Sequence, residues 1–82
     1  FRSVSGDECD LVLEAGSRLI PIEIKATQTP MNRDNSGLGV FLKLFKREAP
    51  FGLLLYPGTQ VIPMGERIMA LPMRAFLTGE RD

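Results

Sequence analysis

The sequence predicts a small α/β domain, in which flanking helices accompany a mixed β-sheet of about four or five strands. Residues 8–14 and 19–26 alternate between apolar and polar side chains, which is typical of half-buried strands. An apolar stripe with helical spacing follows over residues 38–45. Residues 51–56 then form a continuous apolar run, as in a strand that is buried on both faces. A strand, a helix and a buried strand in succession indicate a βαβ unit.

The composition indicates one domain over residues 1–82 and excludes several kinds of active site. Of the 82 residues, 44% are hydrophobic, and 10 Lys and Arg balance 10 Asp and Glu. Because the chain has no His and only one Cys, histidine-based catalysis, a zinc ribbon and an internal disulfide are excluded. We therefore expect a cytoplasmic protein whose chemistry depends on carboxylates, lysine or a hard cation. No apolar run is long enough to cross a membrane.

The chain begins with Phe1 rather than Met, so we expect it to be a piece of a longer chain or a processed product. The sequence contains no phosphate-binding loop of the form G-x-x-x-x-G-K-[S/T]. Gly37 and Gly39 lack the lysine and the spacing that such a loop needs. We therefore expect no nucleotide site in this segment.

The first two predicted strands form a hairpin around a turn at residues 16–17. With these two residues at the centre, the numbers of paired positions add up to 33, so Asp10 lies opposite Glu23 and Glu8 lies opposite Lys25. The other face carries only apolar pairs, which are Cys9 with Ile24, Leu11 with Ile22, and Leu13 with Ile20. Because a slip of one residue would move both sets to the wrong face, the hydrophobic pattern specifies this register.

The rest of the chain is predicted from its apolar spacing and its turn residues. In chain order the elements are a polar loop (27–36), the helix (38–45), the buried strand (51–56), a second loop (59–66), a short strand (67–71) and a short helix (72–77). Ser36 or Asp34 is suited to cap the first helix. Pro72 suits the first turn of the last one.

The hairpin brings together residue types that suit metal-assisted chemistry. Asp10 and Glu23 are predicted to lie directly opposite across the ladder, where two carboxylates repel each other unless something compensates. Mg²⁺ or Mn²⁺ would compensate, because hard cations prefer oxygen ligands. Lys25 follows two residues after Glu23 on the same face, where it can orient or activate a water. These three residues therefore indicate metal-assisted phosphodiester hydrolysis.

A plainer interpretation also agrees with the residues. The pattern Glu-x-Lys is short enough to arise by chance, so Glu23 and Lys25 can equally be surface residues. In that case Lys25 pairs with Glu8 across the strands, which contributes little to stability. The chain would then be a small α/β binding domain with no reaction of its own.

The hairpin residues resemble the core of the restriction-endonuclease-like, or PD-(D/E)xK, superfamily. The resemblance rests on Gly6-Asp7-Glu8-Cys9-Asp10 followed by Leu19-Ile20-Pro21-Ile22-Glu23-Ile24-Lys25-Ala26. More narrowly, residues 1–77 are similar to the C-terminal domain of unknown function found on many bacterial and archaeal AAA-type ATPases. The resemblance implies a restriction-endonuclease-like three-layer fold with sheet order 1-2-3-4-5, in a C-terminal fragment of a longer chain.

The resemblance also implies roles and partners. Asp10 and Glu23 would be metal carboxylates, and the backbone carbonyl of Ile24 would complete the metal shell. Lys25 would act on the nucleophilic water, DNA would be the substrate, and an ATPase domain would lie upstream. Cys9 stands where a proline usually precedes the aspartate. The N-terminal helix of the superfamily is missing, so we expect the upstream segment, a partner chain or a second copy to cover one sheet face.

Further residues are candidates for supporting roles. Glu8 and Gln28 are placed to support the site, although a loop glutamine also has a plainer explanation. The candidate nucleic-acid contacts are Arg33, Lys43, Lys46 and Arg47. A solvated helix face has the same composition, and the neutral total charge argues against bulk electrostatic binding of nucleic acid. The alternative function is therefore a non-catalytic accessory or assembly domain of a P-loop ATPase.

Overall fold

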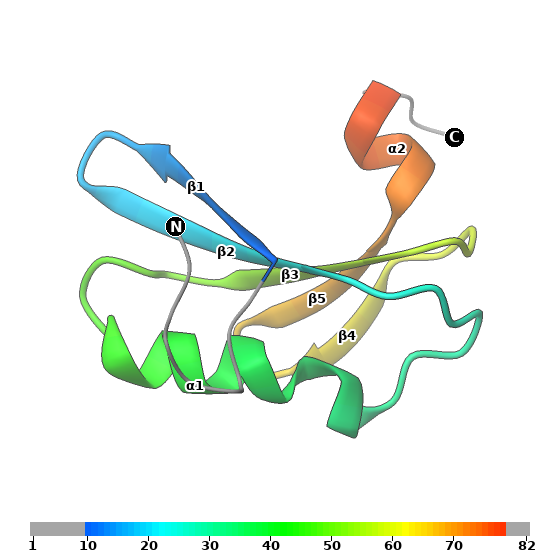
Figure 1. Cartoon of the computed structure of the whole chain (residues 1–82), viewed down its shortest axis with the longest axis horizontal. Helices are drawn as coiled ribbons and strands as arrows, with labels where there is room; N and C mark the ends of the chain where they lie inside the picture. The colour runs from blue at the N-terminus through cyan, green and yellow to red at the C-terminus, as the bar shows by residue number, and fades with distance from the viewer. Residues whose placement is uncertain (1–9, 79–82) are drawn as a thin grey trace.

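The computed structural model describes residues 10–78 as a mixed five-stranded sheet with two α-helices, which confirms the α/β class (Figure 1). The elements are β1 (Leu11–Ala15), β2 (Arg18–Ile24), a 3-10 turn η1 (Asn32–Asn35), α1 (Ser36–Leu44), β3 (Gly52–Tyr56), β4 (Ile62–Gly65), β5 (Ile68–Pro72) and α2 (Met73–Thr78). The strand order is β1-β2-β3-β5-β4. Within the described range, no helix combines the length and the apolar character that a membrane crossing requires.

The hairpin has the register that the turn predicts. Leu11 pairs with Ile22 and Leu13 pairs with Ile20, so the paired positions sum to 33 as expected. Gly16 supplies the positive φ of the turn, at +65°. Among the described residues, β1 covers Leu11–Ala15, and Asp10, which belonged to the predicted strand, lies just before it. Glu8 and Cys9, which belonged to the predicted strand, lie outside the described residues.

The predicted βαβ unit is present. β2 and β3 are parallel, and α1 lies between them in the chain and covers one face of the sheet (Figure 1). Pro21 is fully buried within β2 and packs close to Gly52, where an added β-carbon would lie 3.4 Å from the Pro21 ring. β5 continues the parallel set beyond β3. The predicted central position of residues 51–56 is therefore confirmed.

One strand was not predicted. Residues 59–66 were expected to form a loop, but β4 runs through them and pairs antiparallel with β5. Proline is tolerated at a sheet edge because its missing N–H faces outward, and Pro63 lies in this edge strand beside a bulge. In chain order the last two strands exchange places relative to the expected order 1-2-3-4-5.

The predicted helix caps are also wrong. The N-cap of α1 is Asn35, and its side-chain amide donates to the carbonyl of Met64 at 2.9 Å instead of capping the helix. Asp34 accepts the backbone N–H of Met31 at 2.8 Å and so holds the η1 turn. Pro72 ends β5, and α2 begins one residue later. Asn35 thus contacts a neighbouring strand instead of capping α1, and Asp34 caps the η1 turn instead of α1.

The core lies between α1 and the sheet. Leu38, Phe41 and Leu42 of α1 are buried against Leu54 and Ala70 of the central strands. The stripe that predicted the helix is therefore the one that builds the core. Glu23 of β2 shares this face, since side chains alternate along a strand and Glu23 pairs with Leu54.

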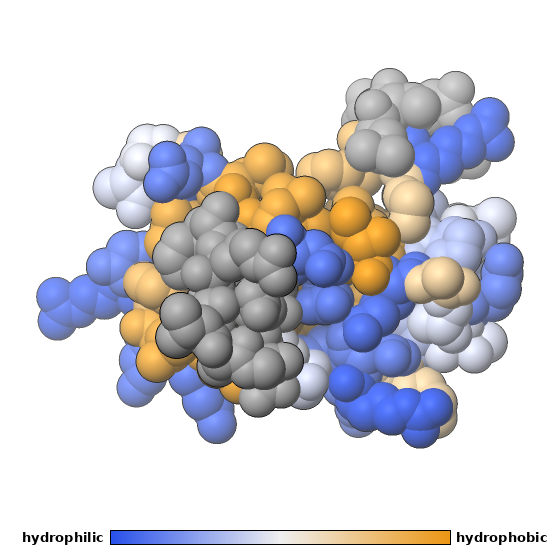
Figure 2. All heavy atoms as spheres, viewed as in Figure 1, coloured by the Kyte–Doolittle hydropathy of each residue, from blue (hydrophilic) through white to orange (hydrophobic). Residues whose placement is uncertain are grey.

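The opposite sheet face is apolar and only partly covered. α2 stands on this side at the end of β5 (Figure 1), and apolar surface is visible between it and the hairpin (Figure 2). Leu13, Ile24 and Met69 are each between 41% and 43% exposed. Ile22 and Leu55 lie on the same face and are buried, so the cover of this face is uneven.

The packing of α1 on β3 can be tested with a matched pair of leucines. Leu54→Ala removes a fully buried side chain and is expected to lower the free energy of unfolding by about 2–5 kcal/mol. Leu44→Ala, at a residue 68% exposed, is expected to change it by less than about 0.5 kcal/mol. Urea unfolding measures both. Equal losses in the two variants would contradict the described core.

Candidate functional site

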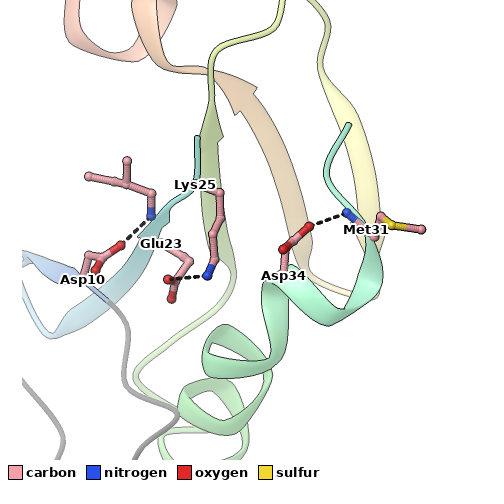
Figure 3. A network of polar contacts seen from close by, with 6 residues as sticks. Asp10, Glu23, Lys25, Met31 and Asp34 are labelled. Atoms are coloured by element: carbon pink, nitrogen blue, oxygen red, sulfur yellow. Dashed lines mark hydrogen bonds and ion pairs between the residues drawn. The ribbon is translucent and has the colours of Figure 1, made fainter. Parts of the chain in front are cut away.

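The candidate site lies at the end of β2, where the first two strands meet the loop that leads to η1 (Figure 3). Glu23 belongs to β2 and is 9% exposed, although it is a carboxylate. It is buried because β2 is an internal strand and because α1 covers the face on which Glu23 lies. The fold thus holds one acidic side chain in a largely dry position.

Asp10 closes the open end of the hairpin. Its backbone N–H donates to the carbonyl of Ile22 at 3.0 Å. Its carboxylate oxygen Oδ2 accepts the backbone N–H of Ile24 at 2.7 Å. The side chain therefore accepts a backbone hydrogen bond from β2 just before Leu11, the first residue of β1. This contact also places the Asp10 carboxylate beside Glu23.

Lys25 lies on the other side of Glu23 in Figure 3. Its Nζ is 3.7 Å from Oε2 of Glu23, and its side chain is 39% exposed. Its backbone is held as well, because the Lys25 N–H donates to the carbonyl of Leu55 at 2.9 Å. The ammonium group is thus held next to the buried carboxylate and remains accessible to solvent.

The Glu23 carboxyl titrates in an unusual environment. Burial raises its pKa above the ordinary value of 4.5, and the charge of Asp10 raises the pKa further. The ammonium group of Lys25 opposes both effects. Perturbed carboxyl groups of this kind cluster at functional sites, although buried ion pairs produce them too. The two carboxylates and the lysine predicted from the hairpin register therefore do meet.

The two carboxylates of the site suit a hard cation that needs few protein ligands. Between residues 10 and 78, no group of three or more His, Cys, Asp or Glu side chains is placed to hold a metal ion. Mg²⁺ typically takes one or two protein carboxylates together with waters and substrate phosphate oxygens. Asp10 and Glu23 supply two carboxylates, with one Asp10 oxygen already bonded to an N–H. The residues present fit such an ion.

The other predicted site residues lie elsewhere. Gln28 and Arg33 are exposed in the segment between β2 and α1, and Lys43 is exposed on α1. Lys46 and Arg47 follow α1. The backbone carbonyl of the next residue, Glu48, accepts a hydrogen bond from the Leu19 N–H at 2.8 Å.

Leu19 is near the start of β2, four residues or about 13 Å along the strand from Glu23. The two basic residues after α1 therefore lie at the far end of the sheet from the site. Glu8 is outside the described residues.

The sequence did not predict the bond between Asp10 and the backbone of Ile24. Period two and the turn place Asp10 opposite Glu23, but the position of the Asp10 carboxylate depends on where β1 begins. The Asp34 contact was missed for a similar reason, because Asp34 was considered only as a cap for α1. An aspartate beside a turn is the available signal, since its short side chain often bonds to nearby backbone N–H groups.

The chain matches one protein-family model. The model described as Domain of unknown function (DUF4143) matches residues 1–76. The chain belongs to this family. Membership of DUF4143 is compatible with an ATPase-associated domain and says nothing about PD-(D/E)xK chemistry. No curated protein and no solved structure matches the chain.

The bond between Asp10 and Ile24 can be tested in this DUF4143 domain by comparing two substitutions. Asp10→Ala leaves the Ile24 N–H without its acceptor and is expected to cost about 1 kcal/mol of unfolding free energy. Asp10→Asn keeps an oxygen at the same place and is expected to cost less. Urea unfolding in the absence of divalent metal measures both. Wild-type stability in Asp10→Ala would show that the contact contributes nothing.

The raised pKa of Glu23 predicts a pH dependence of stability. Because the native state binds the Glu23 proton more tightly than the unfolded chain does, stability falls as pH rises from about 4.5 through the raised pKa. Glu23→Gln has no carboxyl to ionise at this position. The difference in unfolding free energy between this variant and the wild type is therefore expected to shift in favour of the variant as the pH rises through the raised pKa of Glu23. Urea unfolding from pH 4 to pH 8 measures the difference. Glu14→Gln, on exposed β1, controls for the loss of one charge, and identical profiles for the two variants would refute the prediction.

Proposed function

We propose that this DUF4143 chain is a nuclease-like domain that hydrolyses phosphodiester bonds of DNA with a divalent metal ion. The observation that carries the proposal is the buried Glu23 carboxylate, held between Asp10 and Lys25 at the end of an internal strand. A buried carboxylate with a raised pKa is costly to keep, and neither the hairpin register nor the core needs a charge there. A bound cation would offset that cost.

The proposed roles follow from the chemistry of each group. Asp10, Glu23 and the Ile24 carbonyl would hold Mg²⁺ or Mn²⁺, and the ion when bound would polarise the phosphodiester and lower the pKa of a water. Lys25 donates hydrogen bonds from an ammonium group that Glu23 keeps in place. That group orients a nucleophilic water or stabilises negative charge as it develops on the phosphate.

The substrate assignment rests on the exposed basic residues on and around α1. Arg33, Lys43, Lys46 and Arg47 are all exposed. The distance of about 13 Å from Glu23 to the start of β2 corresponds to about four base pairs at 3.4 Å each. A duplex that lies along this side of the domain would therefore reach both the site and the last two basic residues.

A second candidate function is a non-catalytic accessory or assembly domain of a P-loop ATPase. The observation that favours it is the hydrogen bond from the Ile24 N–H to Asp10, which gives this carboxylate a structural use without any metal. The membership of DUF4143 is compatible with this function as well. Under this interpretation Lys25 only balances the charge of Glu23.

Metal-dependent cleavage of supercoiled plasmid tests the proposed hydrolysis. The wild type is expected to nick DNA with Mg²⁺ or Mn²⁺, and Glu23→Ala and Lys25→Ala are expected to reduce the rate by about 100-fold or more. Glu14→Ala, which removes an exposed acid of the same hairpin, is the control for activity carried by a contaminant. Absence of cleavage with every divalent metal would refute the catalytic proposal.

Calorimetry separates the two candidate functions. Mg²⁺ binding that disappears in Asp10→Asn supports the metal site, because this variant keeps an acceptor for the Ile24 N–H and loses only the charge. A chain that neither binds a divalent metal nor cleaves DNA would be the accessory domain.

A further inference from the structure

A groove opens on the sheet face away from α1. It has a volume of about 380 Å³, and it is lined by Phe51, Leu53, Pro63, Ile68 and Met69 together with the turn between β4 and β5. This volume is in the range of sites that take a small ligand or a large side chain. Phe51 and Met69 are 42% and 43% exposed, so both are accessible from solvent.

Arg67 is the charged residue that lines this groove. It lies in the turn between β4 and β5 with φ at +116°, a conformation that residues other than glycine seldom adopt. Its Nη1 donates to the carbonyl of Ala49 at 3.1 Å, which anchors the guanidinium group beside the start of β3. A strained residue with an anchored charge at the edge of an apolar groove is suited to bind a carboxylate.

Apolar side chains continue across the sheet from the groove, and Ile22 among them is fully buried. The register aligns Met69 with Leu53, Leu53 with Ile22, and Ile22 with Leu11, so one apolar row crosses four strands. At about 4.8 Å between strands the row is about 14 Å long. On this face the charged residue of the described strands is Arg18, which alternates with Ile20 and Ile22.

The acidic side chains of the strands lie on one face of the sheet, where Lys25 accompanies Glu23. Glu14 and Glu23 are on the side of α1, whereas Arg18 is on the apolar side and Arg67 borders the groove. Glu66 precedes Arg67 in the turn and does not line the groove. The complement of this surface is an apolar segment flanked by carboxylates.

We propose that the groove and the apolar row bind an amphipathic helix of a partner, with acidic residues beside its apolar stripe. One large apolar side chain enters the groove, and a neighbouring carboxylate pairs with Arg67. The apolar row is about 14 Å long and a strand is about 17 Å long, so the apolar face has an area of only a few hundred Å². A stable dimer buries about 800 Å² on each partner, so this face is too small for a second copy. A second copy would also bring two arginine-bearing faces together. The proposal does not depend on the hydrolytic site, which lies on the other face.

Two fluorescent helical peptides of about 18 residues test this inference by anisotropy. They share one leucine-rich stripe and differ in carrying Glu or Lys beside it. The Glu peptide is expected to bind the wild type at least about tenfold more tightly than the Lys peptide. Met69→Glu is expected to abolish binding of the Glu peptide, because it places a carboxylate within the groove.

Arg67→Gly separates binding from folding. Glycine suits the positive φ, so the fold is retained while the guanidinium group is lost, and the affinity for the Glu peptide is expected to fall about tenfold. Arg33→Ala, at an exposed arginine of η1, is the matched control and is expected to change nothing.

Three results would overturn the inference. Equal affinity for the two peptides would show that the face binds apolar peptides without recognising charge. Sedimentation of the wild type as a dimer that Met69→Glu disrupts would assign the face to a second copy. Binding to vesicles that contain anionic lipid, without binding to the Glu peptide, would assign it to a membrane surface.

Discussion

The position of β2 inside the sheet is the constraint on which the rest of this structure depends. The hairpin turn aligns it with β1 on one side, and the parallel pairing with β3 through the α1 crossover fixes it on the other. Because both neighbours are in place, β2 presents alternate residues to two different environments. One set faces α1 and includes Glu23, whose carboxylate is then buried. The other set includes Ile22 and Ile24 on the apolar face.

Features that depend on local spacing were predictable from the sequence. The turn at Gly16 and the alternation of Leu11 and Leu13 predicted the register, and the register predicted that Asp10 and Glu23 would meet. β4 was not predictable in this way, since a four-residue edge strand with a proline and a bulge has no clear alternation. The prediction that Ser36 or Asp34 caps α1 was wrong because Asp34 accepts the Met31 N–H and Ser36 is already the first helical residue. The N-cap residue, Asn35, bonds to the distant Met64 carbonyl.

The neutral total charge conceals an asymmetric molecule. Acidic side chains of the hairpin lie on the covered face, and the arginines at the apolar face border its exposed surface. The two faces therefore differ in charge, and we propose a cation on one and a carboxylate-bearing partner on the other. A net charge of zero, which argues against bulk attraction to nucleic acid, says little about either face.

The bond between Asp10 and the Ile24 N–H has an evolutionary consequence. Selection for a closed hairpin would preserve this aspartate even in a lineage that no longer catalysed any reaction, because the side chain contributes to folding by itself. The presence of an aspartate here is therefore weak evidence of activity in any member of DUF4143. Glu23 and Lys25 say more about activity. Burying an acidic side chain costs free energy, so a lineage that kept only the structure would tend to replace Glu23 with a neutral residue.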